Sequence, residues 1–394
     1  MTFEVRAVRE EEREECLDLW CTVWPGESSR SYFRRYFYGD VDWLPYYTRV
    51  GMLDGRMVSA VQICRRVVSC GEYRLTMGGI ANVATLPQYR GKGFNTQCLS
   101  SAISVMEADA MDFSLLFTGI HGYYGRLGFA RLSAQYLEAP LPESPPEPGT
   151  LVVRDGTPRD LAAIRSIYDE YNAGRPITVQ RSDAYWRDWV KERNYLVAEA
   201  RTGQVAAYFM ISEYGYKDGE RSEQGGHVEE FGASARCDAA ACLDSLIRAY
   251  LSRLQDRGAA QIKLSLPLDE TVRRGAQRAG LKPEERPIGG GMARLLHPDN
   301  LLRGFLPELN ERWAHVGRPE GELSFATPYG AVSLVGRGTR LQVESRSTGA
   351  YTQDRLFSLL FQGVVSTGEP AAEFEAALFP APAKALAYWG ADGF

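Results

Sequence analysis

The chain lacks several features that would assign it to a common class. No apolar run approaches the roughly 18 residues that a membrane-spanning helix needs, and the charged start, MTFEVR, does not resemble a secretory leader. The seven cysteines include no C-x-x-C spacing, and an odd number argues against a disulfide framework. We therefore expect a protein without a membrane span, located in the reducing cytoplasm.

Histidine and positive charge are also scarce. Only four histidines are present, and none is paired at the spacing of metal ligands, so we expect neither a metal site nor a histidine-based triad. The formal net charge is −5, whereas binding to nucleic acid usually requires a basic face. A nucleic-acid partner is therefore not expected.

The length and two breaks in the pattern indicate the domain organisation. A chain of 394 residues is long for a single core, so two or three domains are expected. Residues 139–150 hold five prolines and predict a stiff linker, and residues 287–291 form a short glycine-rich break. We predict domains at 1–140, 151–286 and 292–394, with an α+β fold and mixed sheets.

The first two segments repeat one order of elements. In the first, strand 3–8 precedes helices near 16–24 and 31–38, and a hairpin with an Asp54-Gly55 turn follows. The second begins with a strand and then Thr157-Pro158, a capped helix start. This repetition predicts an internal duplication, to which the third segment adds a helix, alternating strands and a helix capped by Thr352.

The most informative stretch follows the strand at 75–86. The pattern Gln88-x-x-Gly91-x-Gly93 lies between that strand and a helix that begins near Phe94. Glycines let the backbone approach a ligand closely, and the free amides of a helix start attract phosphate. The charges of Arg90 and Lys92 favour the same ligand, a diphosphate. A P-loop is excluded, because no G-K-[ST] follows.

This stretch, V-A-T-x-P-x-Y-R-G-K-G, resembles the coenzyme A motif of the GNAT superfamily of N-acetyltransferases. The resemblance implies that acetyl-CoA is the co-substrate, with pantetheine along the strand and pyrophosphate on the amides of the turn. The cofactor-binding residues that it implies are Val83, Ala84, Thr85, Gly91, Lys92, Gly93, Phe94, Asn95, Thr96, Gly119 and Ile120.

Acyl transfer from a thioester also requires an acid that protonates the departing thiolate. Tyrosine, with an ordinary pKa of about 10, suits a thiolate of similar basicity. Tyr124, in the motif Y-G-R-L-G-F, matches the position where these acetyltransferases keep a catalytic tyrosine. Tyr123 is its direct neighbour, and only the motif distinguishes the two.

The whole chain resembles the Eis-type (enhanced intracellular survival) acetyltransferases. That resemblance implies an N-terminal GNAT domain, a degenerate second copy, a C-terminal domain similar to sterol carrier protein, and a homo-oligomer, by analogy a hexamer. In the second copy, strand 227–233 is followed by Ser234-Ala235-Arg236-Cys237-Asp238 without glycines. We therefore expect one acetyl-CoA per chain.

The same resemblance implies that the base is the C-terminal carboxylate, here that of Phe394. An apolar last side chain could anchor the terminus in a pocket, where burial would raise the pKa of the carboxylate. Asp392 is a rival carboxylate on the same tail, and His121 lies beside the predicted reacting centre. The roles of both in proton transfer stay open.

The identity of the acceptor is also open. The resemblance implies a primary amine, in an aminoglycoside, a polyamine or a lysine side chain. Carboxylates and aromatic walls suit such cations, and one stretch supplies both, although aromatics at this spacing more often form core: Phe33, Tyr36, Phe37, Asp40, Asp42 and Trp43. Two alternatives are a lipid or sterol carrier, by virtue of the third domain, and an acyl-CoA sensor without turnover.

Overall fold

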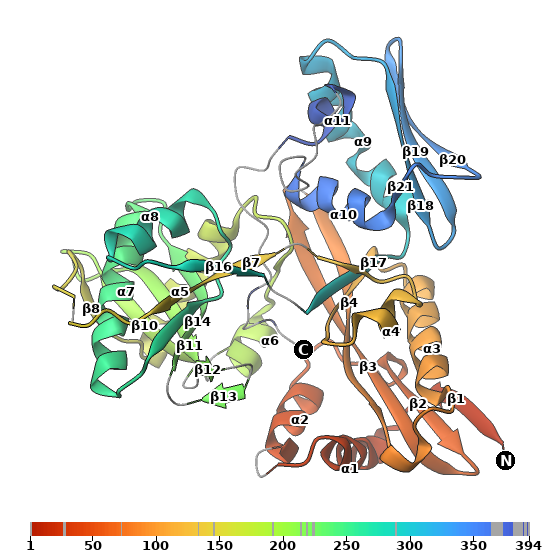
Figure 1. The fold of residues 1–394 in the computed structure, drawn as a ribbon, viewed down its shortest axis with the longest axis horizontal. Helices are drawn as coiled ribbons and strands as arrows, with labels where there is room; N and C mark the ends of the chain where they lie inside the picture. The colour runs from red at the N-terminus through yellow and green to blue at the C-terminus, as the bar shows by residue number, and fades with distance from the viewer. Residues whose placement is uncertain are drawn as a thin grey trace.

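The structure is a computed structural model with three lobes (Figure 1). It describes residues 2–26, 29–71, 73–132, 134–144, 146–190, 193–212, 215–217, 220–222, 225–287, 290–363, 373–380, 389 and 392. Within these residues, no helix is both long and apolar enough to cross a membrane. The mixed sheets and packed helices confirm the predicted α+β fold class.

The first lobe is built on an eight-stranded sheet in the order β1-β2-β3-β4-β5-β17-β6, with β9 paired to β3. All neighbours are antiparallel except β4 and β5, which are parallel. The strands are β1 (Phe3–Ala7), β2 (Thr48–Leu53), β3 (Arg56–Cys70), β4 (Tyr73–Thr85), β5 (Phe113–Phe117), β6 (Ala130–Arg131), β9 (Thr178–Val179) and β17 (Gly291–Leu295).

Helices cover both faces of this sheet. Helices α1 (Arg13–Val23) and α2 (Ser29–Tyr38) pack on one face, against Ala60 and Ala84. Helix α3 (Phe94–Ala108) packs on the other, with α4 (His121–Gly125) beside it. Neighbouring strand residues point to opposite faces, so the core on the α1 side and the core on the α3 side are separate.

The second lobe has a seven-stranded sheet in the order β16-β7-β15-β14-β11-β10-β8, and a small sheet of β12 and β13. Its strands are β7 (Gln135–Pro140), β8 (Val152–Asp155), β10 (Asn194–Glu199), β11 (Val205–Ser212), β12 (Gly215–Lys217), β13 (Glu220–Ser222), β14 (Gly225–Ala233), β15 (Gln261–Leu264) and β16 (Glu284–Pro287). Its helices are α5 (Leu161–Asn172), α6 (Asp183–Tyr185), α7 (Ala239–Asp256) and α8 (Glu270–Arg278).

Apart from β9, which pairs with β3 in the first sheet, the two sheets correspond strand by strand, and one pair of equivalent strands is exchanged between them. In the first lobe, β5 is followed by β17 and then β6, whereas in the second β15 is followed by β7 and then β16. Strand β7 follows the first lobe in sequence, and β17 follows the second (Figure 1). The lobes therefore exchange equivalent strands, which ties them together through backbone hydrogen bonds.

The third lobe is smaller. Strands β18 (Gly321–Thr327), β19 (Gly330–Arg337), β20 (Arg340–Arg346) and β21 (Tyr351–Thr352) form its sheet, and α9 (Pro298–His315), α10 (Gln353–Gln362) and α11 (Glu373–Leu378) pack against it. A Cβ added at Gly321 or Gly336 would lie 2.5 Å or 2.6 Å from the Phe374 side chain. The ring of Phe374 thus covers that face of the sheet directly.

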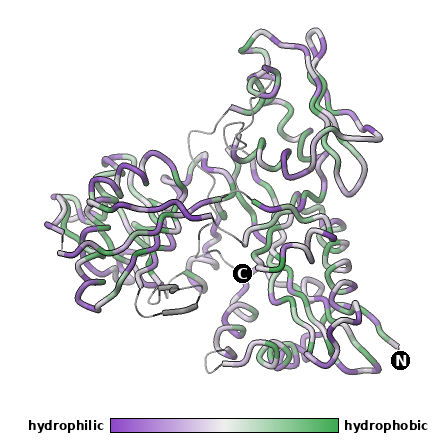
Figure 2. Tube along the Cα trace, in the orientation of Figure 1, coloured by the Kyte–Doolittle hydropathy of each residue, from purple (hydrophilic) through white to green (hydrophobic). Residues whose placement is uncertain are grey.

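Most predicted elements lie close to the observed ones. Asp54 and Gly55 have φ of 47° and 81° and join β2 to β3, which confirms the hairpin. The predicted linker at 139–150 began too early, because Ala139 and Pro140 pair with Ile262 and Gln261 within the second sheet. Figure 2 shows the hydrophobic stretches along the strands and the helix faces that cover them.

Candidate active site

Strands β4 and β5 separate in the middle of the first lobe. Their parallel pairing joins residues 77–79 to residues 113–115 and ends at Gly79. Beyond it, the pairing of β4 with β3 shifts register, and Asn82 has φ of 50°. This bulge bends β4 away from β5. Among the described residues, no strand pairs with residues 80–85 on the β5 side, so this part of β4 presents an open edge.

The predicted pantetheine-binding residues lie along this edge, but they differ in orientation. The carbonyl of Ala84 accepts hydrogen bonds from Ser59 Oγ at 2.8 Å and from Asn95 Nδ2 at 3.1 Å. Val83 and Thr85 flank it and point their backbone groups to the opposite side, as alternation along a strand requires. The backbone of Val83 and the amide of Thr85 are thus the parts that can bind an amide-bearing arm, because the Thr85 carbonyl accepts a hydrogen bond from Arg90 Nε at 3.3 Å.

The predicted phosphate turn has an open backbone. Gly91 and Gly93 have φ of 74° and 78°, and a Cβ added at either would meet nothing within 4 Å. Gly93 is the N-cap of α3 without a side-chain cap, and the first bond of the helix runs from Gln97 N to Gly93 O. In the described part of the chain, the amides of residues 91–96 have no hydrogen-bond partner, so the geometry fits a diphosphate.

The side chains of the turn have different surroundings. Lys92 is exposed, with its Nζ 5.5 Å from the centroid of the Tyr89 ring. Phe94 stacks on Phe3, with centroids 4.2 Å apart. The side chain of Asn95 points to the protein, since it bonds Ala84 and accepts from the Tyr123 hydroxyl at 3.0 Å. A ligand at this turn would therefore meet the backbone and the exposed Lys92, but not the side-chain amide of Asn95.

The two neighbouring tyrosines are separated by their contacts. The Tyr123 hydroxyl lies at the start of α3, 3.0 Å from Asn95 Oδ1 and 3.3 Å from Thr96 Oγ1. Tyr124 is buried against Phe129 and lines the large cavity described below. Burial, with a smaller contribution from Tyr123, raises the pKa of Tyr124 to about 12. Its phenol is therefore protonated at neutral pH.

A cavity of about 520 Å³ opens where β4 and β5 separate. Its walls come from the end of α1, from α2, from both strands and from the loop before α4. The lining residues are Trp24, Ser29, Tyr32, Phe33, Ile80, Ala81, Asn82, Val83, Leu116, Phe117, Thr118, Ile120 and Tyr124. A cavity of this size, next to an open strand edge, suits a small-molecule reaction site.

The remaining predicted residues of the first lobe lie around this cavity. Ile120 is 63% exposed at its rim, and a Cβ added at Gly119 would meet nothing within 4 Å. His121 begins α4, and its Nδ1 lies 3.0 Å from Arg131 Nη2. This contact with Arg131 holds the imidazole to a neighbouring strand.

The residues predicted to bind the acceptor, between Phe33 and Trp43, lie partly at the cavity and partly in the core. Phe33 lines the cavity. Phe37 is fully buried against Trp20, and the Asp40 carboxylate binds Arg66 in a buried ion pair at 2.8 Å. The Trp43 indole donates to Thr48 Oγ1. Sequence reasoning missed Trp24, Tyr32, Asn82 and Phe117, although an exposed aromatic after the end of α1 was a usable signal.

The chain tail returns to the second lobe. Both Asp392 oxygens bind Arg181, at 2.8 Å from Nε and 3.1 Å from Nη2, and Arg181 also binds Glu230. All three side chains are fully buried. The Trp389 indole donates to Asn172 Oδ1 at 3.1 Å. Asp392 is therefore committed to an ion pair, which disfavours it as the catalytic base, and Phe394 lies outside the described residues.

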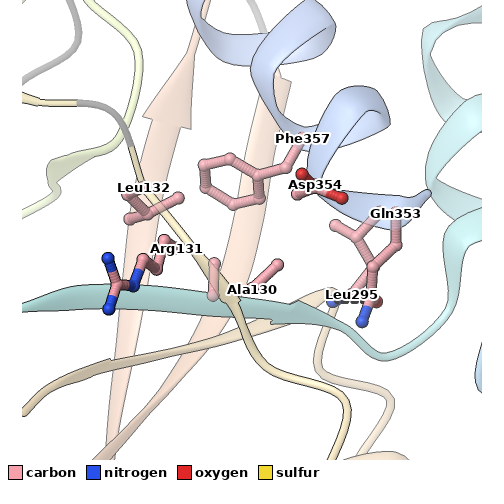
Figure 3. Close-up of a pocket in the computed structure, with 8 residues that line it drawn as sticks. Ala130, Arg131, Leu132, Leu295, Gln353, Asp354 and Phe357 are labelled. Atoms are coloured by element: carbon pink, nitrogen blue, oxygen red, sulfur yellow. Dashed lines mark hydrogen bonds between the residues drawn. The ribbon is translucent and has the colours of Figure 1, made fainter. Parts of the chain in front are cut away.

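A second pocket lies between the first and third lobes, under α10 (Figure 3). Its walls include Arg131, Leu132, Leu295, Gln353 and Phe357. The side chains fill it, so that it leaves essentially no room for a water molecule. This pocket is a packing seam and offers no site for a ligand.

Comparison with known proteins finds a family match for the first lobe and similar folds for the whole chain. Residues 4–132 match the family described as "Acetyltransferase (GNAT) domain". No curated protein matches the sequence. Among solved structures, a probable N-acyltransferase of Enterococcus faecalis V583 superposes with a TM-score of 0.66 at 14% identity, covering 98% of this chain and 97% of that chain.

Two further structures extend the likeness over almost the whole chain. A GCN5-related N-acetyltransferase of Anabaena variabilis gives a TM-score of 0.66 at 14% identity, covering 96% of this chain and 97% of that chain. Eis1 of Mycobacterium abscessus gives a TM-score of 0.55 at 15% identity, covering 100% of this chain and 99% of that chain. The chain thus has a GNAT-family N-acetyltransferase fold, and its likeness to an Eis protein spans its full length.

Proposed function

We propose that this chain, with its GNAT fold, is an acetyl-CoA-dependent N-acetyltransferase that acts on a primary amine. One observation carries the proposal: the open edge of β4 leads directly to a helix start whose amides are unused. The edge offers hydrogen bonds to the amides of pantetheine, and the helix start offers its dipole and N–H groups to a diphosphate. Coenzyme A contains both groups in that order.

The proposed residues divide into backbone and side-chain contributors. Val83 and Thr85 bind the arm, and the amides of residues 91–96 bind the phosphates, with Lys92 as a nearby cation. Ile120 lines the cavity where the thioester would lie, and Gly119 precedes it in the same loop. The free amides, the open glycines and the adjoining cavity all support this arrangement.

Bound acetyl-CoA supplies an activated acetyl group as a thioester. The amine nitrogen forms a bond to the carbonyl carbon while the carbon–sulfur bond breaks, so one proton leaves the amine and another reaches the departing sulfur. In our proposal, the Tyr124 phenol donates the second proton. Its raised pKa, about 12, keeps the phenol protonated until the thiolate forms.

We assign the role of base to the C-terminal carboxylate of Phe394. The anchoring of the preceding tail supports this assignment, because the Trp389 bond to Asn172 and the Asp392 ion pair with Arg181 fix the chain just before its end. An anchored tail loses less entropy when it positions a carboxylate than a frayed one would.

Other parts of the proposal rest on the likeness to Eis proteins. They are an aminoglycoside, a polyamine or a lysine side chain as acceptor, a sterol-carrier-like third lobe, a homo-oligomer and a cytoplasmic location. The role of lipid or sterol carrier has less support, because Phe374 packs on the sheet of the third lobe. We therefore keep the transferase as the single proposed function.

The test measures free thiol released from acetyl-CoA in the presence of amines. Deleting Phe394, or extending the chain beyond it, should lower kcat by about 100-fold while the dissociation constant of acetyl-CoA, measured by calorimetry, stays unchanged. Full activity in the extended chain would refute the terminal base. Absence of acetyl-CoA binding in the natural chain would refute the function itself.

A further inference from the structure

Apolar surface gathers at one place on the first lobe. Large hydrophobic side chains are seldom exposed together on a monomer unless they serve binding. Yet Trp24, Tyr32, Phe117 and Ile120 are 42%, 48%, 49% and 63% exposed, and all four line the 520 Å³ cavity. The cavity thus gathers apolar side-chain area that stays exposed to water when no ligand is bound.

Helix α2 presents this surface through its spacing. Ser29, Tyr32 and Phe33 share one helical face and line the cavity, and the Trp24 ring lies 5.7 Å from that of Phe33. Two of the three arginines of α2 bind acidic side chains of α1: Arg30 binds Asp18 and Glu14, and Arg34 binds Glu14. The wall formed by Trp24, Tyr32 and Phe33, here called the aromatic wall, is therefore uncharged.

The position of the aromatic wall indicates that it contacts the acceptor amine and not acetyl-CoA. Helices α1 and α2 pack on one face of the sheet, whereas α3, with its open amides, packs on the other. The gap between β4 and β5 connects the two faces, and Tyr124 lines it. A thioester that enters from the α3 side would therefore meet an amine that enters from the α2 side.

We propose that the acceptor is a primary monoamine with an aromatic or alkyl body, whose apolar part packs on the aromatic wall. This inference rests on the proposed function and narrows its acceptors: it is compatible with a lysine side chain and disfavours the polycationic aminoglycosides and polyamines. A second ammonium group on the acceptor would lose its hydration against Trp24, Tyr32 and Phe33, and unpaired burial of a charge is costly. The thirteen described lining residues carry no charged side chain.

The experiment compares amines of equal heavy-atom count: 2-phenylethylamine, octylamine and heptane-1,7-diamine, with kanamycin as a polycation. Thiol release should give both monoamines a kcat/KM at least about tenfold above that of the diamine, as burial of a few methylene groups predicts. Calorimetry without acetyl-CoA provides a second readout, in which the monoamines should bind more tightly than the diamine.

A charge variant sharpens the test. Tyr32→Glu places a carboxylate in the aromatic wall and should move the preference at least about tenfold towards the diamine, since an opposite charge then pairs with the second ammonium. The control, Val316→Glu, adds the same charge at an equally exposed residue, 48% against 48%, outside the cavity lining, and should leave the preference unchanged.

Three results would overturn the inference. A natural chain that prefers the diamine or kanamycin has a polar acceptor site, although continued thiol release would leave the proposed function intact. A higher kcat/KM with octanoyl-CoA than with acetyl-CoA would assign the aromatic wall to the acyl chain. Binding of acetyl-CoA without thiol release for any amine would remove the proposed function together with this inference.

Discussion

The first and second lobes share one sheet topology, but the turns that follow their equivalent strands differ. In the first lobe, β4 leads to Gly91-x-Gly93, and α3 begins without a side-chain cap. In the second, β14 leads to Asp238, whose carboxylate accepts hydrogen bonds from the amides of Ala240 at 3.0 Å and Ala241 at 3.3 Å. The same helix start is open in one lobe and occupied in the other.

The charge of Asp238 adds to the difference between the two helix starts. Asp238 also pairs with Arg278 at 2.8 Å, and this bond, together with the backbone amides, lowers the pKa of its carboxyl group. The group is therefore ionised at neutral pH, at the place where a diphosphate would have to bind. A duplicated fold can thus keep one ligand site and turn the other copy to a structural task, which here includes holding the chain tail.

Closing the open turn should have the largest effect. Gly91→Glu introduces a negative side chain into the phosphate space and a non-glycine residue at φ of 74°. We expect the dissociation constant of acetyl-CoA to rise at least about 1,000-fold, or about 4 kcal/mol, as measured by calorimetry.

A matched variant separates charge from backbone strain. Gly258 has φ of 68°, and a Cβ there would also meet open space, but it lies between α7 and β15 in the second lobe. Gly258→Glu should therefore cost stability to a similar degree and leave acetyl-CoA affinity unchanged. Equal loss of binding in both variants would show that strain, and not the phosphate space, explains the first result.

Removing the cation that holds the tail in the second lobe should have the next largest effect. Arg181→Met leaves Glu230 and Asp392 buried without their partner, so the free energy of unfolding should fall by about 3 kcal/mol. Urea denaturation of the full chain measures this change. The milder Asp392→Asn should lower kcat without weakening acetyl-CoA binding. If both variants kept the stability and the kcat of the natural chain, the tail would have no role in catalysis.

Tyr124→Phe tests the acid in the first lobe. We expect kcat to fall about 100-fold with unchanged acetyl-CoA affinity. Because burial raises the pKa of Tyr124 to about 12, the donor form persists through alkaline pH, so this group should cause no decline in the kcat profile of the natural chain up to about pH 10. Tyr123→Phe is the control and should act mainly on acetyl-CoA binding, through Asn95 and Thr96. Equal kcat in Tyr124→Phe and the natural chain would exclude the assignment.

Local chemistry was readable from the sequence. The turn at Asp54 and Gly55, the helix start at Thr157 and the glycines at 91 and 93 all lie where their conformational preferences indicate. Each depends on neighbours within a few residues, so composition and spacing suffice to find it.

Long-range pairing was not readable. Nothing in the sequence says that β7 joins the second sheet or that β17 joins the first. Likewise, Arg181 and Asp392 are 211 residues apart, and only the folded chain shows that they meet. Tyr32 and Phe117 were missed as cavity residues for the same reason, since α2 and β5 meet only in space.

The smallest expected effect concerns the closed turn itself. Asp238→Ala removes the side-chain cap of α7, so the free energy of unfolding should fall by about 1 kcal/mol, measured by urea denaturation. Asp238→Asn keeps an oxygen that can accept from Ala240 and Ala241 and should lose less. Neither variant supplies the glycines that admit a diphosphate to the backbone, so calorimetry should still find a single acetyl-CoA per chain. If the Asp238→Ala variant bound a second acetyl-CoA, the carboxylate alone, and not the lack of glycines, would explain why the second lobe binds none.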